Sequence, residues 1–460
     1  MMGTAYPGYR SVRSRWVPHV PEHWLLLRAK NFLREIDDRT TTGEETLLSM
    51  RQHRGLVPHN DVSNKRIDAV HLIGYKKAQP NELVLNRMQA GNAMFFRNRQ
   101  SGLVSPDYAV FRLLRDDNPE YLGHLFRSWP IRGLFRSESK GLGTGTSGFL
   151  RLYSDRFAAL EIPLPPRPEQ DQIVAYLRAQ DAHIARYIKA KRELIALLTE
   201  QKLRIIDHAV TRGLDVSVKL KPSGIEWLGE VPEHWEQRRL KFIASNITNQ
   251  TSTKASDEIY LAMEHVESWT GIARPAEGKI EFASTVKQFI IDDVLFGKLR
   301  PYLAKVARAH RAGVCVSEFL VLRSRMTLLL PAYLEQMLRC KRVIDLINSS
   351  TAGAKMPRAD WTFIGNVRLP IPPFDEQKKI LSFVAHETKD LDEAIARTKD
   401  EITLIREYRE RLIADVVTGQ IDVRGWQPGP DDAVNDEDLA ALGDDEEHEE
   451  SAEEDDDGAD

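Results

Sequence analysis

The sequence has very little cysteine: Cys315 and Cys340 are the only two in 460 residues. Two thiols exclude a multi-cysteine zinc site, and a chain of this length is no disulfide-stapled miniprotein. No stretch approaches the roughly 18 uncharged apolar residues of a membrane helix, which excludes a membrane-spanning protein. The basic residues 1–15 lack the apolar segment of a secretory signal. We therefore expect a globular protein of the reducing cytoplasm, with no membrane partner.

Signatures of catalytic and nucleotide-binding sites are absent as well. The sequence has no Walker-type phosphate loop, no H-E-x-x-H, no G-x-S-x-G and no acidic calcium loop. It also lacks the Asn/Asp-Pro-Pro-aromatic tetrapeptide with which amino-methyltransferases hold a target base. Residues 143–148 satisfy G-x-G-x-x-G, but no clear strand precedes them and no convincing helix follows, which argues against a dinucleotide site. We expect a chain that is not an enzyme and holds no metal or cofactor.

The net charge of −4 conceals two parts of opposite sign. Residues 431–460 carry 17 of the 68 acidic side chains and no Lys or Arg, which leaves 51 acidic against 64 basic residues elsewhere, a net charge of +13. A basic body is typical of proteins that bind nucleic acid. We expect residues 425–460 to form a disordered acidic tail, because such a run buries too little apolar surface to order itself. The tail either aids solubility or competes with nucleic acid as a polyanion mimic.

Most of the sequence consists of two similar tandem copies. Residues 20–24, Val-Pro-Glu-His-Trp, return letter for letter at 231–235, an offset of 211. Farther along, residues 162–177 match 369–384 at an offset of 207 and share three prolines and a Glu-Gln pair. Two tandem copies of about 207 residues are far longer than solenoid repeats and indicate a duplicated domain with pseudo-twofold symmetry.

Each copy starts with a mixed domain and ends with a long helix. Short β-branched and aromatic runs such as 108–114 and 319–323 alternate with turn clusters, which favours an α+β fold. The stretches 169–212 and 374–418 have no Gly or Pro and repeat apolar residues at helical spacing. These patterns predict a mixed domain at 1–166, a long helix with a linker at 167–220, a second mixed domain at 221–373, a second long helix at 374–424 and the acidic tail at 425–460.

A helix of about 44 residues spans roughly 66 Å, which is too long for one core to bury. Its apolar face needs a partner, and the most economical one is the duplicate helix in an antiparallel coiled coil, with the two domains at opposite ends. The alternative is two independent surface helices, each packed on its own domain. Four seam positions are polar, so the seam is imperfect and leaves apolar surface for another subunit: Gln180, Lys191, Glu387 and Glu401.

Two short motifs recur at the borders of the domains. The Glu-His of Val-Pro-Glu-His-Trp has the chemistry of an acid and base pair, but a structural turn whose tryptophan anchors the domain is the simpler interpretation. An extended Pro-Pro pair ends each domain, and Glu-Gln follows in the first helical turn. We assign structural roles to Pro21, Trp24, Pro165, Pro166, Glu169, Gln170, Pro232, Trp235, Pro372, Pro373, Glu376 and Gln377.

Basic residues lie among apolar and turn residues at equivalent places in both copies. They have the chemistry to neutralise phosphates, and arginine is the commonest reader of guanine edges. For any single residue the simpler interpretation is a solvated face, but the duplication and the positive charge of the body favour a DNA-binding set. The candidate DNA-binding residues are Arg87, Arg97, Arg99, Lys140, Lys298, Arg300, Lys305, Arg308, Lys355 and Arg358.

Together these features resemble the DNA specificity subunit of type I restriction-modification enzymes. The resemblance covers about residues 10–424, and it rests on the motif that opens each half and on four strings: LEIPLPPRPEQDQIVAYL (160–177), VRLPIPPFDEQKKILSFV (367–384), YLAMEHVES (260–268) and LFGKLRPYLAKV (295–306). The first half departs from it, with LNRMQAGNA at 85–93 in place of the KLRPYL string and LLSMRQH at 47–53 in place of LAMEHVE. Its recognition loops are therefore expected to work differently.

The resemblance implies two target recognition domains, each reading one half of a split, asymmetric double-stranded DNA sequence. It implies docking of two methyltransferase subunits and of restriction subunits with motor and nuclease activity. S-adenosylmethionine, ATP and Mg²⁺ would then belong to these partners. The helix pair would be a ruler that holds both domains on one face of the DNA, about one helical turn or roughly 34 Å apart.

Two other interpretations remain open from the sequence. The chain could be a two-headed coiled-coil adaptor in another phage-defence or DNA-modification complex, although the basic body argues against a protein that does not bind DNA. It could itself be a nuclease or methyltransferase, which the missing motifs argue against.

Overall fold

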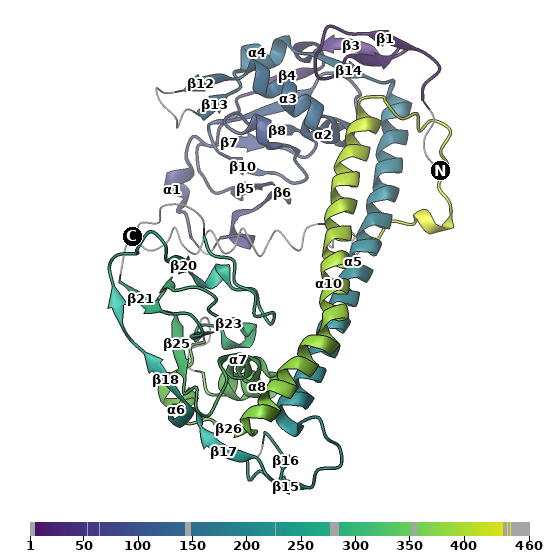
Figure 1. The fold of residues 1–460 in the computed structure, drawn as a ribbon. Coiled ribbons are helices and arrows are strands. Elements are labelled where there is room, and N and C mark those ends of the chain that lie inside the picture. The colour runs from purple at the N-terminus through teal and green to yellow at the C-terminus, as the bar shows by residue number, and fades with distance from the viewer. Residues whose placement is uncertain are drawn as a thin grey trace. The chain divides into compact units, whose positions relative to one another are not determined.

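The computed structural model describes residues 5–52, 54–63, 65–142, 149–225, 227–276, 285–351 and 357–435, together with 439 and 442. The chain forms two compact units (Figure 1). Unit 1 consists of residues 1–193 and 399–460, and unit 2 of residues 194–398. None of the helices in the described ranges combines the length and the apolar composition that a bilayer crossing needs.

The core of unit 1 lies on a four-stranded antiparallel sheet in the order β4-β11-β8-β9. Apolar residues of the central strand β11 are covered by two helices that follow it, and an aromatic cluster fills the space between them. Phe95 stacks on Phe126 with ring centroids 4.6 Å apart, and Phe111, Phe135 and Phe157 surround this pair. The elements of the sheet and its cover are β4 (Leu33–Ile36), β8 (Leu83–Asn86), β9 (Phe95–Arg97), β11 (Tyr108–Leu113), α2 (Pro119–Arg127), α3 (Trp129–Glu138) and α4 (Ser154–Ala159).

Short two-stranded sheets complete unit 1. They join β1 (Tyr9–Ser11) to β2 (His19–Pro21), β3 (Leu25–Arg28) to β14 (Glu161–Leu164), β5 (Leu48–Arg51) to β6 (Gly55–Pro58), β7 (Lys76–Ala78) to β10 (Gly102–Val104) and β12 (Lys140–Leu142) to β13 (Phe149–Arg151). The short helix α1 (Ala69–Leu72) lies between β6 and β7 in the chain. The β3/β14 pair positions the start of the first long helix, because β14 leads directly into it.

Unit 2 repeats the main sheet of unit 1. Its first sheet has the order β18-β25-β22-β23, the equivalent of β4-β11-β8-β9, and a second four-stranded sheet has the order β19-β21-β24-β20. The bounds are β18 (Ala244–Ile247), β19 (Gln250–Thr251), β20 (Ile259–Leu261), β21 (Val286–Phe289), β22 (Val294–Gly297), β23 (Val306–Arg308), β24 (Gly313–Cys315), β25 (Phe319–Ser324), α6 (Leu240–Ile243), α7 (Pro331–Arg339), α8 (Lys341–Ser349) and α9 (Trp361–Ile364). Two further pairs are β15 (Leu220–Pro222) with β16 (Glu230–Pro232), and β17 (Glu236–Arg239) with β26 (Arg368–Ile371).

The two long helices are α5 (Arg167–Arg212) and α10 (Phe374–Val417), and each contributes to both units. Unit 1 buries Ile173 from the start of α5 and Val416 from the end of α10 in one core. Unit 2 buries Val210 from the end of α5 and Ile380 from the start of α10. The helices therefore pair antiparallel, and the predicted fold class, mixed domains with two long helices that pack together, is confirmed.

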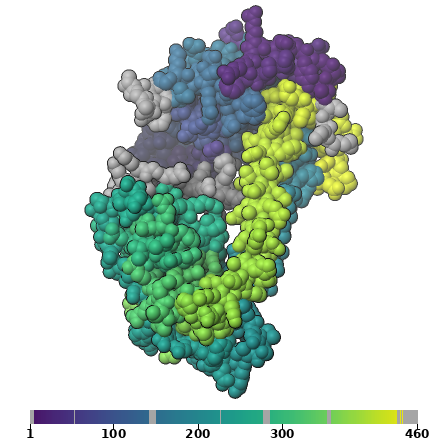
Figure 2. All heavy atoms as spheres, viewed as in Figure 1, coloured from purple at the N-terminus to yellow at the C-terminus, as the bar shows by residue number. Residues whose placement is uncertain are grey.

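Charged contacts join the helices where the apolar seam is interrupted. In unit 1, Lys191 Nζ lies 2.6 Å from Glu401 Oε2, so two of the four polar seam residues pair with each other. In unit 2, Lys202 Nζ lies 2.5 Å from Asp392 Oδ1. The last part of α10 lies at the surface of unit 1 (Figure 2). Large apolar side chains stay exposed near the middle of the helices: Tyr187, Leu194, Leu197, Leu404 and Tyr408.

After α10 the chain turns back and runs along α5 within unit 1. Trp426 meets the ring of Tyr176 edge to face, with centroids 5.5 Å apart, and Asp432 Oδ1 lies 2.7 Å from His183 Nε2. Residues 425–435 therefore differ from the disordered tail that we expected to begin at residue 425, because Trp426 packs on Tyr176 and Asp432 pairs with His183. Most of the acidic run lies beyond residue 435 and outside the described residues.

Candidate nucleic-acid interface

A carboxylate at the start of α5 ties the helix to the domain that precedes it. Glu169 Oε1 accepts hydrogen bonds from Trp24 Nε1 at 2.9 Å and from the Tyr6 hydroxyl at 2.7 Å, and His23 Nε2 lies 2.7 Å from Glu169 Oε2. Burial and the neighbouring carboxylate raise the pKa of the Tyr6 phenol. The histidine of the repeated motif therefore meets a carboxylate of the helix, an arrangement that fixes the helix start.

Unit 2 builds the same arrangement with equivalent residues. Glu376 accepts from Trp235 Nε1 at 3.1 Å, and His234 Nε2 lies 2.7 Å from its other oxygen. Both tryptophans, Trp24 and Trp235, are only 1% exposed. We call the His, Trp and Glu of each unit the clasp.

The glutamine after each clasp carboxylate is fully buried and holds the loop that leads into the next helix of its domain. Gln170 Oε1 accepts from the Asn118 backbone N–H at 2.7 Å, and its amide donates to Pro165 O at 2.9 Å. Gln377 repeats this pattern with the Leu330 N–H at 2.9 Å and Pro372 O at 3.0 Å. The Pro-Pro and Glu-Gln residues thus form one connected joint between domain and helix.

The domain of each unit also contacts the end of the other long helix. In unit 1 the Tyr121 hydroxyl donates to Val417 O at 3.0 Å, and in unit 2 the Tyr333 hydroxyl donates to Val210 O at 3.0 Å. Gly213 ends α5 with φ +77°, and a Cβ there would lie 3.1 Å from both Trp235 and Glu376. Glycine supplies this left-handed cap without a steric cost. One domain therefore holds the start of one helix and the end of its partner.

In unit 2, backbone contacts join the segment of Lys298 and Arg300 to the segment of Arg358, and Lys298 and Arg358 both contact Glu318. The backbone of Lys298 donates to Glu318 O at 3.0 Å, and Arg300 N donates to Pro357 O at 2.8 Å. Leu299 forms a β-bridge with Arg358, whose guanidinium donates to Glu318 Oε1 at 3.1 Å. Within the described ranges, no hydrogen bond or ion pair engages the side chains of Lys298 and Arg300.

Two other candidates of unit 2 make contacts inside the domain. Lys305 donates to Met263 O at 2.6 Å, and burial lowers the pKa of its ammonium group. Arg308 donates to Asp292 Oδ1 at 2.7 Å. Lys355 lies outside the described residues.

Among the candidate DNA-binding residues of unit 1, some pair with carboxylates and others are exposed. Arg87 pairs with Glu35, and Arg97 Nη1 lies 3.0 Å from Glu120 Oε2. Arg99 and Lys140 are exposed, and no described residue bonds to either side chain. Arg99, Lys140, Lys298 and Arg300 are therefore the candidates whose charge is available to a ligand.

Two buried lysines, Lys76 and Lys287, were not identified from the sequence. Lys76 donates to Tyr108 O at 2.8 Å, and Lys287 donates to Phe319 O at 2.7 Å, at the first residue of the central strand in each unit. Burial lowers the pKa of both ammonium groups, and the nearby charge of Lys298 adds to this effect at Lys287. The offset of 211 relates the two lysines, so the repeat itself is the signal that could have found them.

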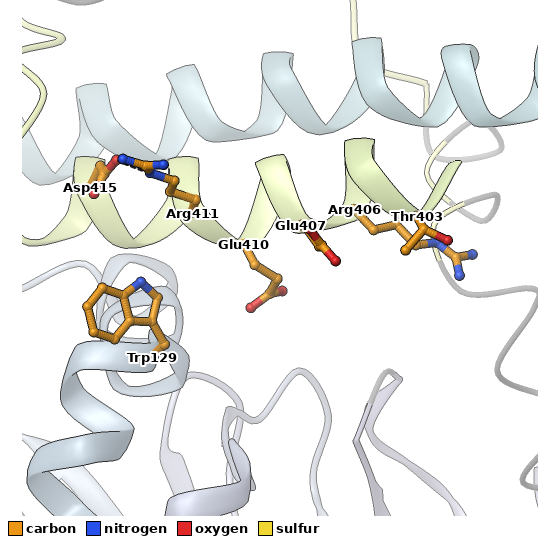
Figure 3. A pocket seen from close by; sticks show the side chains of 7 residues that line it. All are labelled: Trp129, Thr403, Arg406, Glu407, Glu410, Arg411 and Asp415. Atoms are coloured by element: carbon orange, nitrogen blue, oxygen red, sulfur yellow. Dashed lines mark ion pairs between the residues drawn. The ribbon is translucent and has the colours of Figure 1, made fainter. Parts of the chain in front are cut away.

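Unit 1 contains a hollow of about 680 Å³ between the start of α3 and the last part of α10 (Figure 3). Trp129 faces Glu410 and the Arg411–Asp415 ion pair across it, and Thr403, Arg406 and Glu407 complete the wall. Three carboxylates against two guanidinium groups make it unsuited to a phosphate. Across the described ranges, no group of three or more His, Cys, Asp or Glu side chains could hold a metal ion.

Comparisons with known proteins give one consistent result, although no family model matches the sequence. The chain is 22% identical over 217 residues to the type I restriction enzyme EcoDI specificity subunit of Escherichia coli, covering 46% of this chain and 48% of that protein. It is 24% identical over 205 residues to the putative MjaX specificity subunit of Methanocaldococcus jannaschii, covering 42% and 47%. These two matches span about half the length of the relatives. The MjaVIII specificity subunit of the same organism is 23% identical over 323 residues, covering 65% of this chain and 70% of that protein.

One solved structure resembles the fold. A chain from a structural study of assembly and conformational transition in the type I R-M system has a TM-score of 0.55 and 16% identity, over 87% of this chain and 99% of that one. The HsdS subunit from Thermoanaerobacter tengcongensis has a TM-score of 0.41 and 17% identity, over 87% and 98%.

Proposed function

We propose that this chain, which resembles the specificity subunits of type I restriction enzymes in sequence and fold, recognises DNA for such a complex. In this role it binds double-stranded DNA in the cytoplasm at a bipartite, asymmetric target and performs no catalysis itself. Residues 1–166 and 221–373 are its two target recognition domains. The observation that carries the proposal is the duplicated clasp, which attaches a basic mixed domain to the helix pair in each unit.

In this proposal the helix pair sets the spacing of a split target. At 1.5 Å per residue, the 46 residues of α5 span about 69 Å. In each unit the domain contacts the start of one long helix and the end of the other. We assign base reading to loops of the domains and target spacing to the helices.

Partner subunits complete the proposal. Two methyltransferase subunits would dock on the helices, where exposed Leu404 and Tyr408 provide apolar surface. Restriction subunits would join them. S-adenosylmethionine, ATP and Mg²⁺ are assigned to these partners, as the resemblance to specificity subunits implies.

The test is the pattern of DNA methylation in the source cell, with the chain present and with its coding sequence deleted. We expect a bipartite methylated motif that disappears with the chain and returns when it is restored. An unchanged methylation pattern, together with no salt-dependent shift of duplex DNA by the purified chain, would contradict the proposal and favour the adaptor interpretation.

Lys298→Ala and Arg300→Ala are expected to relax recognition of the half-site read by unit 2. A base contact of this kind contributes about 1–3 kcal/mol to discrimination, and neither side chain is occupied by a partner among the described residues. Selection of bound duplexes from a random pool measures the effect on each half-site separately.

Lys219→Ala is the matched control, because it removes one positive charge from an exposed side chain of unit 2 beside the clasp. Equal weakening on all sequences with a shallower salt dependence would show that Lys298 and Arg300 contact phosphates instead of bases.

A further inference from the structure

The turn after β22 in unit 2 has an unusual backbone. Arg300 and Ala304 adopt left-handed conformations, with φ of 49° and 46°, on either side of the 3₁₀ turn Pro301–Leu303. Residues other than glycine rarely take this conformation, and they keep it only where surrounding structure fixes it. Such positions cluster at ligand-binding sites.

Three neighbouring segments hold this turn in place. Lys305 donates to Met263 O at 2.6 Å, and Trp269 N donates to Ala304 O at 3.3 Å. On the other side, Arg300 N donates to Pro357 O at 2.8 Å. The turn is therefore braced from two directions and is not a freely moving loop.

Tyr302 is the side chain that the braced turn presents to solvent. It is 44% exposed, whereas Ala304 beside it is 1% exposed. Within the described ranges, the Tyr302 hydroxyl makes no hydrogen bond and its ring meets no other aromatic ring. Lys298 and Arg300, whose charges are available, lie four and two residues before it. An amphipathic ring beside cations is the composition that nucleic-acid surfaces use.

The equivalent turn of unit 1 is built differently. At an offset of 211, Gly91 stands where unit 2 has Tyr302, and Ala93 keeps the left-handed backbone with φ of 62°. Arg136 of α3 covers this position: a Cβ on Gly91 would lie 2.4 Å from Arg136 Cγ, and the guanidinium donates to Asn92 Oδ1 at 3.0 Å. In unit 1 the Arg136 side chain occupies the space that a side chain at this tip would take, so the projecting ring belongs to unit 2.

We propose that the braced turn presents the ring of Tyr302 to the base edges of the half-site that unit 2 reads, which makes Tyr302 a specificity-determining residue. This inference rests on the proposed function. Lys298 and Arg300 contact bases of the same half-site, and the ring of Tyr302 packs against a neighbouring base pair in the groove. Because unit 1 has a glycine there, the contact exists in one half-site only and contributes to the asymmetry of the target.

The experiment is selection of bound duplexes from a random pool by the full chain, comparing the wild type with Tyr302→Ala and Tyr302→Phe. We expect Tyr302→Ala to lose about tenfold in preference at one or two adjacent base pairs of a single half-site. Tyr302→Phe retains the preference, because the ring makes the contact. Phe242→Ala removes another exposed aromatic ring of unit 2, from α6, and leaves both half-sites unchanged.

Three results would decide against this role for Tyr302. Unchanged base preference of Tyr302→Ala, while Lys298→Ala still relaxes the half-site, overturns the assignment and leaves the proposed function intact. Uniform weakening on every sequence also overturns it, because the ring would then touch only the sugar-phosphate backbone. A wild-type chain that selects no sequence at all contradicts the proposed function itself. Thermal unfolding of each variant, expected to match the wild type, confirms that an exposed residue was changed without loss of fold.

Discussion

Deleting one helical turn from both long helices at matched positions is expected to shorten the spacer between the two half-sites by about two base pairs. The deletion removes residues 194–197 of α5 and 395–398 of α10, between the Lys191–Glu401 and Lys202–Asp392 ion pairs. Four residues correspond to about 6 Å of helix and about 400° of rotation, so the remaining faces stay within about 40° of their original direction. One base-pair step is about 3.4 Å.

Methylation mapping in cells that carry the shortened chain measures this change. Both half-site sequences should persist, because no recognition domain is altered. The control removes the four residues from α5 alone. We expect this variant to have a less stable helix pair, because the Lys191–Glu401 and Lys202–Asp392 ion pairs then no longer align together. A changed half-site sequence with the original spacer would contradict the proposal that the helix pair sets the spacer length.

Trp235→Ala is expected to lower the free energy of unfolding of unit 2 by about 3–5 kcal/mol, the usual cost of truncating a buried large aromatic side chain. The indole is 1% exposed, donates to Glu376 and packs beside Gly213 at the end of α5. Its loss therefore opens a cavity and removes a hydrogen bond from the carboxylate. Calorimetry or urea unfolding of the full chain gives the value.

Trp129→Ala provides the matched control, because this tryptophan is 48% exposed at the start of α3. Its removal is expected to change stability by less than about 1 kcal/mol. Equal stability changes in the two variants would mean that the clasp does not hold the domain to the helices.

The long helices could be predicted from the sequence because their signal is local. The absence of Gly and Pro from 169–212 and 374–418 predicts limits that lie within two residues of α5 and α10. The antiparallel pairing followed from the length of the helices, which one core cannot bury. The packed segment around Trp426 could not be predicted, because the acidic run that follows it from residue 431 predicts a solvated tail and a single aromatic side chain gives no periodic signal.

The candidate interface was less accessible to sequence analysis. Whether a basic side chain is available depends on carboxylates that are distant along the chain: Arg87 pairs with Glu35, 52 residues earlier. The same is true of the clasps, since Trp24 and Glu169 are 145 residues apart. The repeat located these residues as important, but only the folded chain distinguishes an arginine that braces a sheet from one that faces solvent.

The segment that returns along α5 has a practical consequence for anyone who shortens this protein. A chain ended at residue 424 would lose Trp426 and Asp432, leaving Tyr176 without its aromatic neighbour and His183 without its carboxylate. At the equivalent place on α10, Phe383 is already 38% exposed. Truncation at residue 424 would expose apolar surface on α5 in addition to the exposed Phe383 of α10. We expect the shortened chain to self-associate through these surfaces.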